Sequence, residues 1–502
     1  MSRPNVLFVM TDQQRFDTIA ALGNSHIYTP NLDRLVRRGV TFTNAYSTTP
    51  VCVAARYTIR TGCEALTTRA ITNQFAVPAP GQAATMEGRC GPYLAKVMRD
   101  WGYRTFGIGK FHTTPTFEDL GYMAHLHSEE MYDSAEERAR DAYASWIAKE
   151  HPHFDFIEAL MGERSEMYYM PQMSPLPAEL NVEAWAAGRA VEQINVNDER
   201  PYFGFVSFVG PHPPLAPPIP FNRMYNPDRM PAPICGDLRV DHMDGYLPWM
   251  NHAIWAENVD ELRAKCCKAR YYGEITYIDQ CLGRILDTVD TRPDADNTLI
   301  CFFSDHGDLL GDHHAWQRES FFEASTHIPF LLSWPARLPK DVRRNELVCR
   351  TDLFAIATGA AGSLSAREGV DVLGVLEGKA SPRETLFGFY GPPGDRRFKI
   401  MVRIHDWKYI YFANGGIEQL FNVAEDPHEL RLRNDDALDV LKSLRAKAIE
   451  RLSKPEGAGT LVNGTLLALP HGPVREKRRV LQSAASRGVH GFPDRPEDLL
   501  KK

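Results

Sequence analysis

The sequence predicts an α/β fold with a doubly wound, mostly parallel sheet that carries helices on both faces. Apolar, strand-like runs alternate with helical stretches over most of the chain. The strand-like runs are Val6–Met10, Tyr103–Gly107, Tyr202–Phe208, Thr298–Phe303 and Pro329–Trp334, and the helical stretches include Ser134–Lys149, Val182–Ile194 and Val259–Val289. Strands that alternate with helices are typical of a parallel sheet covered on both faces.

The pattern changes in the last quarter of the chain. From about Leu386, short strands are joined by turns such as Asn414-Gly415-Gly416, and a helix follows around Ala437–Ser453. Short strands joined by tight turns indicate an antiparallel sheet. We therefore expect a larger α/β domain over residues 1–382 and a smaller α+β subdomain over residues 383–502.

Composition narrows the classes of function. The 502 residues are 43% hydrophobic and 24% charged, as in ordinary globular proteins. A formal net charge of −7 and a pI near 6.2 give no electrostatic footprint for nucleic acid. No apolar run approaches the roughly 18 residues of a membrane span, and the first strand begins near Pro4, which leaves no room for a signal peptide. Nine cysteines without a framework spacing agree with a reducing compartment, so we expect a cytoplasmic protein.

The segment from Cys52 to Gly62 is the most informative one. It predicts a short helix that begins at Cys52 and ends where Gly62 stands. Unpaired N–H groups and the dipole at a helix N-terminus favour an anion, and Arg56 lies one turn away on the same face. By itself, a cysteine is more often a small buried apolar residue.

Two other segments end in polar side chains directly after a buried strand. Asp12 and Gln13 follow the run that begins at Asn5, and Asp305 and His306 follow the run that begins at Asn297. Since ligands gather beyond the carboxyl ends of parallel strands, these side chains are expected at one edge of the sheet. Oxygen-rich ligation with one imidazole suits Ca²⁺, or Mn²⁺ as a softer choice, better than Zn²⁺. Taken alone, Asp12 could equally be a helix N-cap.

Together these segments resemble the formylglycine-dependent (type I) sulfatases of the alkaline-phosphatase superfamily. In that family the cysteine of a Cys-x-Pro-x-Arg or Cys-x-Ala-x-Arg element is oxidised to formylglycine. The likeness covers nearly the whole chain and continues in Gly109-Lys110-Phe111-His112, Gly210-Pro211-His212-Pro213, Trp316-Gln317-Arg318, Phe322-Glu323-Ala324-Ser325, Asp406–Tyr411 and Gln419–Pro427. The resemblance implies an alkaline-phosphatase-like sheet with a smaller C-terminal antiparallel subdomain.

The resemblance also assigns roles to residues. It implies that one divalent cation is bound by Asp12, Gln13, Cys52, Asp305 and His306, and that the catalytic residues are Cys52, Arg56, Lys110, His112, His212 and Arg318. In the mechanism it implies, the hydrated aldehyde at position 52 attacks sulfur with help from Asp305, and His212 protonates the departing alcohol. His112 then takes the proton that lets sulfate leave by elimination. Each residue also has an ordinary alternative, such as a solvated lysine or a loop histidine; their joint occurrence in order favours the site.

Two positions depart from the commonest family pattern. Ala54 stands where proline is usual, which points to a radical-SAM maturase for Cys52. Arg318 stands where many relatives have lysine. Because arginine can clamp a sulfate oxygen but cannot release a proton near neutrality, the acid role falls to His212.

The expected activity is therefore hydrolysis of an aryl or carbohydrate sulfate ester. Two alternatives remain: a phosphonate monoester or phosphodiester hydrolase with nearly the same site, and a silent anion-binding protein in which Cys52 stays a thiol. The stretches Glu163–Pro177 and Phe221–Trp255 are rich in Tyr, Trp, Met and Pro, and they either wall the leaving-group pocket or cover the core. We expect no nucleic acid or membrane partner, and the sequence leaves the oligomeric state open.

Overall fold

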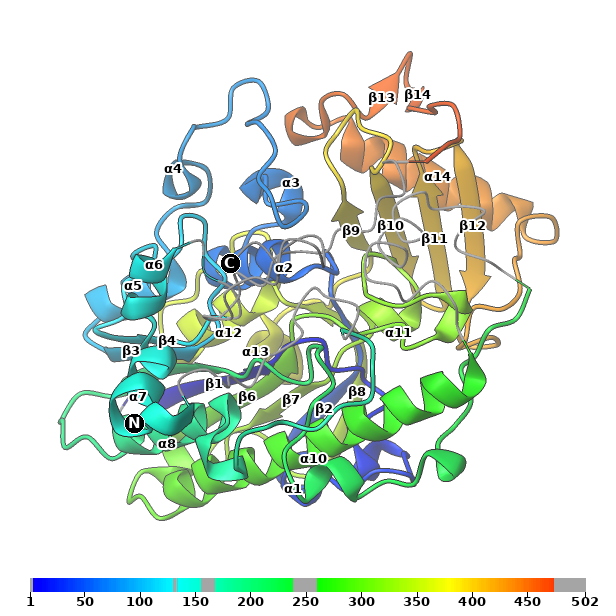
Figure 1. Cartoon of the computed structure of the whole chain (residues 1–502). Helices are drawn as coiled ribbons and strands as arrows, with labels where there is room; N and C mark the ends of the chain where they lie inside the picture. Colours follow the sequence, from blue (N-terminus) through cyan, green and yellow to red (C-terminus); the bar gives the residue numbers. More distant parts are fainter. Residues whose placement is uncertain (1–2, 130–131, 133, 155–167, 238–259, 474–502) are drawn as a thin grey trace, which may run out of the picture.

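The structure is a computed structural model, and it describes residues 3–129, 132, 134–154, 168–237 and 260–473. Within these residues the central sheet has eight strands in the order β4-β3-β5-β1-β6-β7-β2-β8 (Figure 1). Their bounds are β1 Asn5–Thr11, β2 Val40–Tyr46, β3 Arg104–Gly109, β4 Ala124–His127, β5 Tyr202–Ser207, β6 Thr298–Ser304, β7 Phe330–Ser333 and β8 Val342–Cys349. Strand β7 runs antiparallel to both of its neighbours, and the other pairs are parallel. The predicted mostly parallel α/β sheet is confirmed.

Strand β1 lies in the middle of the sheet and is buried on both faces. Its residues Val6, Phe8 and Met10 pack into one hydrophobic core, and Leu7 and Val9 pack into the other. This alternation follows from the two-residue period of a strand. Since both faces are covered, every position is apolar, which is why the run was recognisable in the sequence.

Helices cover both faces of the sheet (Figure 1). One core contains residues of α1 (Pro30–Arg38), α8 (Val182–Ile194) and α10 (Glu261–Asp290), and the other contains residues of α2 (Cys52–Thr61), α5 (Leu94–Asp100), α12 (Asp352–Ala360) and α13 (Val372–Leu376). Shorter helices are α3 Ala65–Thr68, α4 Met86–Cys90 and α11 Glu323–Thr326. Among the described residues, no helix is long and apolar enough to span a bilayer.

A separate antiparallel sheet follows near the end of the chain. It has the order β12-β11-β10-β9, with β9 Leu386–Tyr390, β10 Lys399–Ile404, β11 Trp407–Phe412 and β12 Ile417–Asn422, and it carries α14 Leu438–Leu452 and the hairpin β13 Leu461–Val462 with β14 Thr465–Leu466. Gly415 and Gly416 adopt φ of 87° and 65° in the turn between β11 and β12, a conformation that favours glycine. The boundary predicted at residues 382 and 383 falls between α13 and β9 and stays a prediction.

Two local predictions differ from the structure. The stretch 134–149 was expected to be one helix, but it forms α6 (Ala135–Arg140) and α7 (Ala142–Glu150). Asp141 ends the first helix in an extended conformation and caps the second by accepting from the N–H of Ala144, because an aspartate competes for backbone donors. Strands β2, β4 and β8 were not predicted, since each carries polar residues that break the apolar run.

Candidate active site

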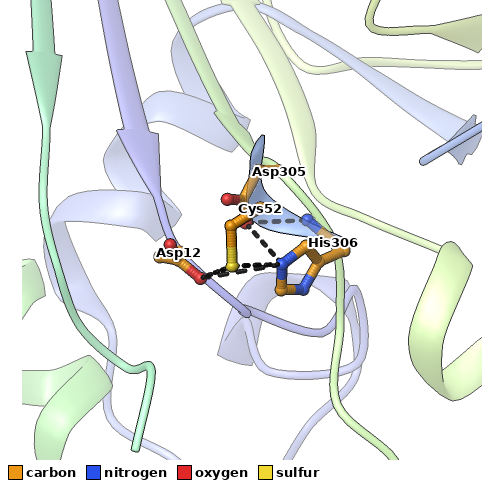
Figure 2. Close-up of side chains that lie close together, drawn as sticks. All are labelled: Asp12, Cys52, Asp305 and His306. Carbon is orange, nitrogen blue, oxygen red and sulfur yellow. Dashed lines mark hydrogen bonds and ion pairs between the residues drawn. The ribbon is translucent and has the colours of Figure 1, made fainter. Parts of the chain in front are cut away.

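The carboxyl ends of β1 and β6 bring four side chains together. The two strands pair in parallel along their whole length, so the residues that follow them, Asp12 and Asp305, leave the sheet side by side. Donor atoms of Asp12, Cys52, Asp305 and His306 all lie within 4.8 Å of one another, and all four side chains are buried (Figure 2). The expected convergence of these distant segments is what the structure has.

Cys52 is the first residue of α2, and Gly62, with φ of 67°, ends that helix as predicted. The Sγ atom of Cys52 lies 3.3 Å from Nε2 of His306 and 3.8 Å from Oδ1 of Asp12. Nη2 of Arg318 lies 3.0 Å from the same sulfur. The side chain at position 52 therefore stands between the carboxylate cluster and a guanidinium.

Two further cations lie against Asp12. Arg56 donates from Nη2 to Oδ2 of Asp12 at 2.8 Å, and its Nε lies 3.3 Å from Oδ2 of Asp305. Nζ of Lys110, which directly follows β3, lies 2.6 Å from Oδ2 of Asp12. Arg56 also donates to the hydroxyl of Ser207 at the end of β5 at 2.9 Å. The ends of β1, β3, β5 and β6 thus meet around one buried charge cluster.

Gln13 links this cluster to Arg318. Its backbone N–H donates to Oδ1 of Asp305 at 3.0 Å, and its Oε1 accepts from Nη1 of Arg318 at 2.8 Å. Gln13 has φ of 69°, a left-handed conformation that costs a non-glycine residue on the order of 1 kcal/mol. The carboxylate of Asp305 holds that conformation by accepting the N–H of Gln13.

The two catalytic histidine candidates stand in different environments. His212, in the loop after β5, is 2% exposed. Its Nδ1 lies 2.7 Å from the carbonyl oxygen of Pro213, and its Nε2 lies 3.1 Å from the hydroxyl of Tyr168. His112 is half-buried with φ of 53°, and its backbone N–H donates to both oxygens of Glu129 at 3.0 and 3.1 Å. The structure brings His212 close enough to Asp12 to contribute to its electrostatics.

Burial and neighbouring charges shift the pKa values in opposite directions. Burial raises the pKa of Asp12, but Lys110, His212 and Arg56 outweigh it and hold that pKa well below its usual range. Burial and the charge of Asp12 raise the pKa of Asp305, against Arg56 and Lys110, to about 7. Two carboxylates this close disfavour joint ionisation, and a cation between them would remove that penalty.

The donor set fits a divalent cation. Nδ1 of His306 lies 3.0 Å from the carbonyl oxygen of Gly307, which can only accept, so Nδ1 carries the proton and the bare Nε2 faces the cluster. Burial lowers the pKa of His306 well below its usual value, so the imidazole is neutral and can act as a ligand. With the carboxylates of Asp12 and Asp305 and the amide oxygen of Gln13, the set is oxygen-rich, as Ca²⁺ or Mn²⁺ requires.

The sequence analysis missed a layer of residues behind the cluster. The hydroxyl of Tyr169 donates to Oδ2 of Asp308 at 2.7 Å and accepts from Nε2 of Gln13 at 3.0 Å and from the N–H of Gln317 at 3.1 Å. Asp308 stands two residues after His306, so its place in the chain was a usable signal. Tyr169 gave only a weak one, because it is one aromatic residue in a stretch rich in them.

That aromatic stretch can be assessed in part. Tyr168 and Tyr169 are fully buried, and Tyr168 contacts His212, so this part of the stretch lies at the site. Residues 163–167 and 238–255 of the two predicted walls lie outside the described residues. The choice between pocket wall and core cover is therefore resolved only for the two tyrosines.

Comparisons with known proteins agree with this arrangement. The sulfatase family model matches residues 4–363, and a model described as N-sulphoglucosamine sulphohydrolase, C-terminal, matches residues 311–454. An arylsulfatase of Clostridium perfringens is 27% identical over 490 residues, which cover 93% of this chain and 98% of the relative. PehA of Trinickia caryophylli, described as a multifunctional alkaline phosphatase superfamily protein, is 32% identical over 366 residues, which cover 66% of this chain and 68% of PehA.

A solved structure shows the same fold. The phosphonate monoester hydrolase of Agrobacterium radiobacter superposes with a TM-score of 0.73 at 24% identity, over 90% of this chain and 95% of that one. The family model spans most of the chain and contains the strand ends and the helix that form the cluster. The chain therefore belongs to the sulfatase family of the alkaline-phosphatase superfamily and is an enzyme of that family.

Proposed function

We propose that this enzyme hydrolyses an aryl or carbohydrate sulfate ester through formylglycine made from Cys52, beside one divalent cation. The observation that carries the proposal is the position of Cys52. Its sulfur stands at a helix N-terminus, 3.0 Å from Arg318 and within 4.8 Å of two carboxylates and an imidazole. This is where a nucleophile, an anionic ester and a metal ion would have to meet.

An unmodified Cys52 is a poor nucleophile in this setting. Burial raises the pKa of its thiol, against the opposing charge of Arg318, to about 12. The thiol is therefore protonated at neutral pH, whereas the thiolate is the reactive form of cysteine. The hydrate of an aldehyde at this position would supply a hydroxyl nucleophile in its place. Ala54 supports a radical-SAM maturase as the partner that makes the aldehyde.

The metal ligands we propose are Asp12, Gln13, Asp305, His306 and the converted side chain at position 52. When bound, the cation would act as a Lewis acid that offsets negative charge on the ester oxygens. We propose Ca²⁺ as the ion and Mn²⁺ as the alternative, because carboxylate and amide oxygens dominate the donor set.

The charges of the protein favour an anionic substrate. Three cations, Arg56, Lys110 and Arg318, face two carboxylates, those of Asp12 and Asp305. Arg56 and Lys110 are paired with these carboxylates, while Arg318 lies against the sulfur of Cys52. Arg318 is therefore the cation best placed to clamp an oxygen of the sulfate group.

Proton transfer falls to the two histidines. We propose His212 as the source of the proton for the departing alcohol, because an imidazole gains and loses a proton near neutral pH. His112 is proposed as the base for the release of sulfate. The arginine at position 318 supports this division, since it cannot donate a proton in this pH range.

A phosphonate monoester or phosphodiester hydrolase is the second candidate. The names of the phosphonate monoester hydrolase and of PehA favour it, since both belong to proteins related to this one in fold or sequence. The third candidate, an anion-binding protein with an unmodified Cys52, has in its favour only that the sequence carries cysteine at this position.

Steady-state kinetics on two esters with the same leaving group separates these candidates. The substrates are 4-nitrophenyl sulfate and 4-nitrophenyl phenylphosphonate, and the enzyme is produced with a maturase and assayed with Ca²⁺. We expect kcat/KM for the sulfate to be at least about tenfold higher. A higher value for the phosphonate would reverse the choice, and no turnover of either ester by converted enzyme would favour the silent protein.

A further inference from the structure

Both ring nitrogens of His212 are engaged by neighbouring groups. Nδ1 lies 2.7 Å from the carbonyl oxygen of Pro213. A carbonyl oxygen only accepts, so the proton of the neutral imidazole is on Nδ1. The bare Nε2 then accepts from the hydroxyl of Tyr168 at 3.1 Å. In its resting state, His212 thus presents its reactive nitrogen to a phenol.

Tyr168 is held firmly in place. The neighbouring Tyr169 is tied by its hydroxyl to Asp308 at 2.7 Å, and its carbonyl oxygen accepts from Nη2 of Arg263 on α10 at 3.0 Å. The two tyrosine rings pack edge to face, with centroids 5.3 Å apart, and both are fully buried. The phenol therefore has a fixed position relative to the metal-ligand loop.

The phenol also lies on the substrate side of His212. Burial lowers the pKa of Arg318, but Cys52, Tyr168 and Glu319 more than offset this and raise it well above its usual value. Tyr168 is therefore close enough to interact with the guanidinium that contacts position 52. Its hydroxyl stands between His212 on one side and Arg318 with Cys52 on the other.

We propose that Tyr168 is a catalytic residue that passes a proton from His212 to the leaving-group oxygen. When His212 is doubly protonated, its Nε2–H donates to the oxygen of Tyr168, which turns the tyrosine O–H toward the ester. As the bond between sulfur and the leaving oxygen breaks, that oxygen takes the tyrosine proton. The tyrosine oxygen takes the proton of Nε2, which leaves His212 neutral with its Nδ1–H on Pro213. His212 regains its proton from solvent before the next turnover.

This inference rests on the proposed ester hydrolysis and adds a residue to it. The variant Tyr168→Phe keeps the ring and removes only the hydroxyl. The control is Tyr143→Phe, because the hydroxyl of Tyr143 is also buried but donates to the carbonyl oxygen of Leu180 at 2.9 Å, in the core against α8. Both variants are checked by thermal unfolding before they are assayed.

The test measures kcat/KM for a series of aryl sulfates from 4-nitrophenyl to phenyl sulfate. A proton donor matters most for a poor leaving group, so we expect Tyr168→Phe to reduce the rate on phenyl sulfate about 100-fold and on 4-nitrophenyl sulfate by less than about threefold. His212→Ala should show the same dependence, and the double variant should lose little more, because the two residues act in one chain. Tyr143→Phe should leave the whole series unchanged.

Three results would overturn the proposal. One is an equal loss across the series, which would make Tyr168 a packing residue; another is no loss at all. The third is additive losses in the double variant. If wild-type enzyme turns over phosphonate monoesters and not sulfates, the proposed function fails by itself, and the same series of leaving groups on phenylphosphonate then tests the relay.

Discussion

Two buried networks of charge in this protein use similar side chains for different ends. At the ends of β1 and β6, Asp12 and Asp305 lie beside Arg56 and Lys110. Where α11 meets the C-terminal sheet (Figure 1), Lys408 lies 2.7 Å from Oε1 of Glu323 and 2.8 Å from Oε1 of Glu429. Each network places a fully buried lysine against a carboxylate, and each contains two carboxylates.

The networks differ in how their carboxylates are used. Glu323 is further bonded by the hydroxyl of Tyr46 at 3.1 Å, and Glu429 accepts the N–H of Glu323, so the protein itself supplies partners for this pair. At the strand ends, the carboxylates share their space with the neutral His306 and the sulfur of Cys52. The first network joins two parts of the fold, whereas the second leaves donors for an ion and a substrate. Substitutions in the two networks should therefore affect different properties.

The largest effect is expected from Cys52→Ala. It removes the proposed nucleophile, so kcat/KM for an aryl sulfate should fall by at least about 10⁴-fold. Alanine is a good helix residue and Cys52 forms no structural bond, so the midpoint of thermal unfolding should move by only a few degrees, within about 4 °C. Residual activity near that of wild type would remove position 52 from the mechanism.

Asp305→Asn should reduce activity next. The amide keeps the shape but loses the charge, and we expect kcat/KM to fall at least about 100-fold and the Ca²⁺ concentration needed for half activity to rise. Wild-type enzyme treated with EDTA should lose activity to a similar extent and regain it with Ca²⁺. Unchanged activity after EDTA dialysis, with metal content confirmed to be zero by mass spectrometry, would contradict the metal site.

Lys408→Met should act on stability and leave chemistry unchanged. It leaves Glu323 and Glu429 buried without their shared cation, which costs about 3 kcal/mol in the free energy of unfolding. Urea denaturation measures this loss, and kcat/KM per folded molecule should stay within about twofold of wild type. A large loss of kcat/KM with unchanged stability would show that the two networks are not separate in function.

Glu429→Gln should give the smallest effect, and it depends on pH. Burial and the charge of Glu323 raise the pKa of Glu429, against Lys408, to about 7, above its ordinary value of 4.5. The protonated form is therefore favoured in the fold, and its contribution to stability is complete below pH 4.5 and is lost as the pH rises through 7. Because glutamine does not ionise, the variant should gain on the order of 1 kcal/mol relative to wild type over this range.

Urea denaturation of wild type and Glu429→Gln at pH 4.5, 6 and 7.5 checks this sign. The difference in unfolding free energy should change in favour of the variant as the pH increases. A difference that is the same at all three values would show that Glu429 does not change its protonation in this range.

The parts of the fold that could be predicted from sequence share one property. Strands β1, β5 and β6 are buried on both faces, so their apolar runs were visible and their polar ends marked the site. Strands β4 and β8 lie at the edges of the sheet and carry polar residues, so no local pattern identified them. Burial on both faces is thus what makes a strand recognisable here.

The site could be predicted only as far as its residues occur in short motifs. Asp12, Cys52 and Asp305 were found because each follows a strand or begins a helix. Tyr168 and Tyr169 contact the site through hydroxyl groups, and nothing in the sequence near them indicates which of many aromatic residues does so. Contacts made through tertiary structure, such as that between Tyr168 and His212, had no local signal.

The central claim is that the cysteine at position 52 is converted before the enzyme acts. Mass spectrometry of the tryptic peptide Gly39–Arg56, from enzyme produced with a radical-SAM maturase, tests it directly. The account predicts a peptide in which one sulfur and two hydrogen atoms are replaced by one oxygen, in a fraction that increases in proportion to sulfatase activity. Full sulfatase activity in protein whose peptide retains only unmodified cysteine would contradict it.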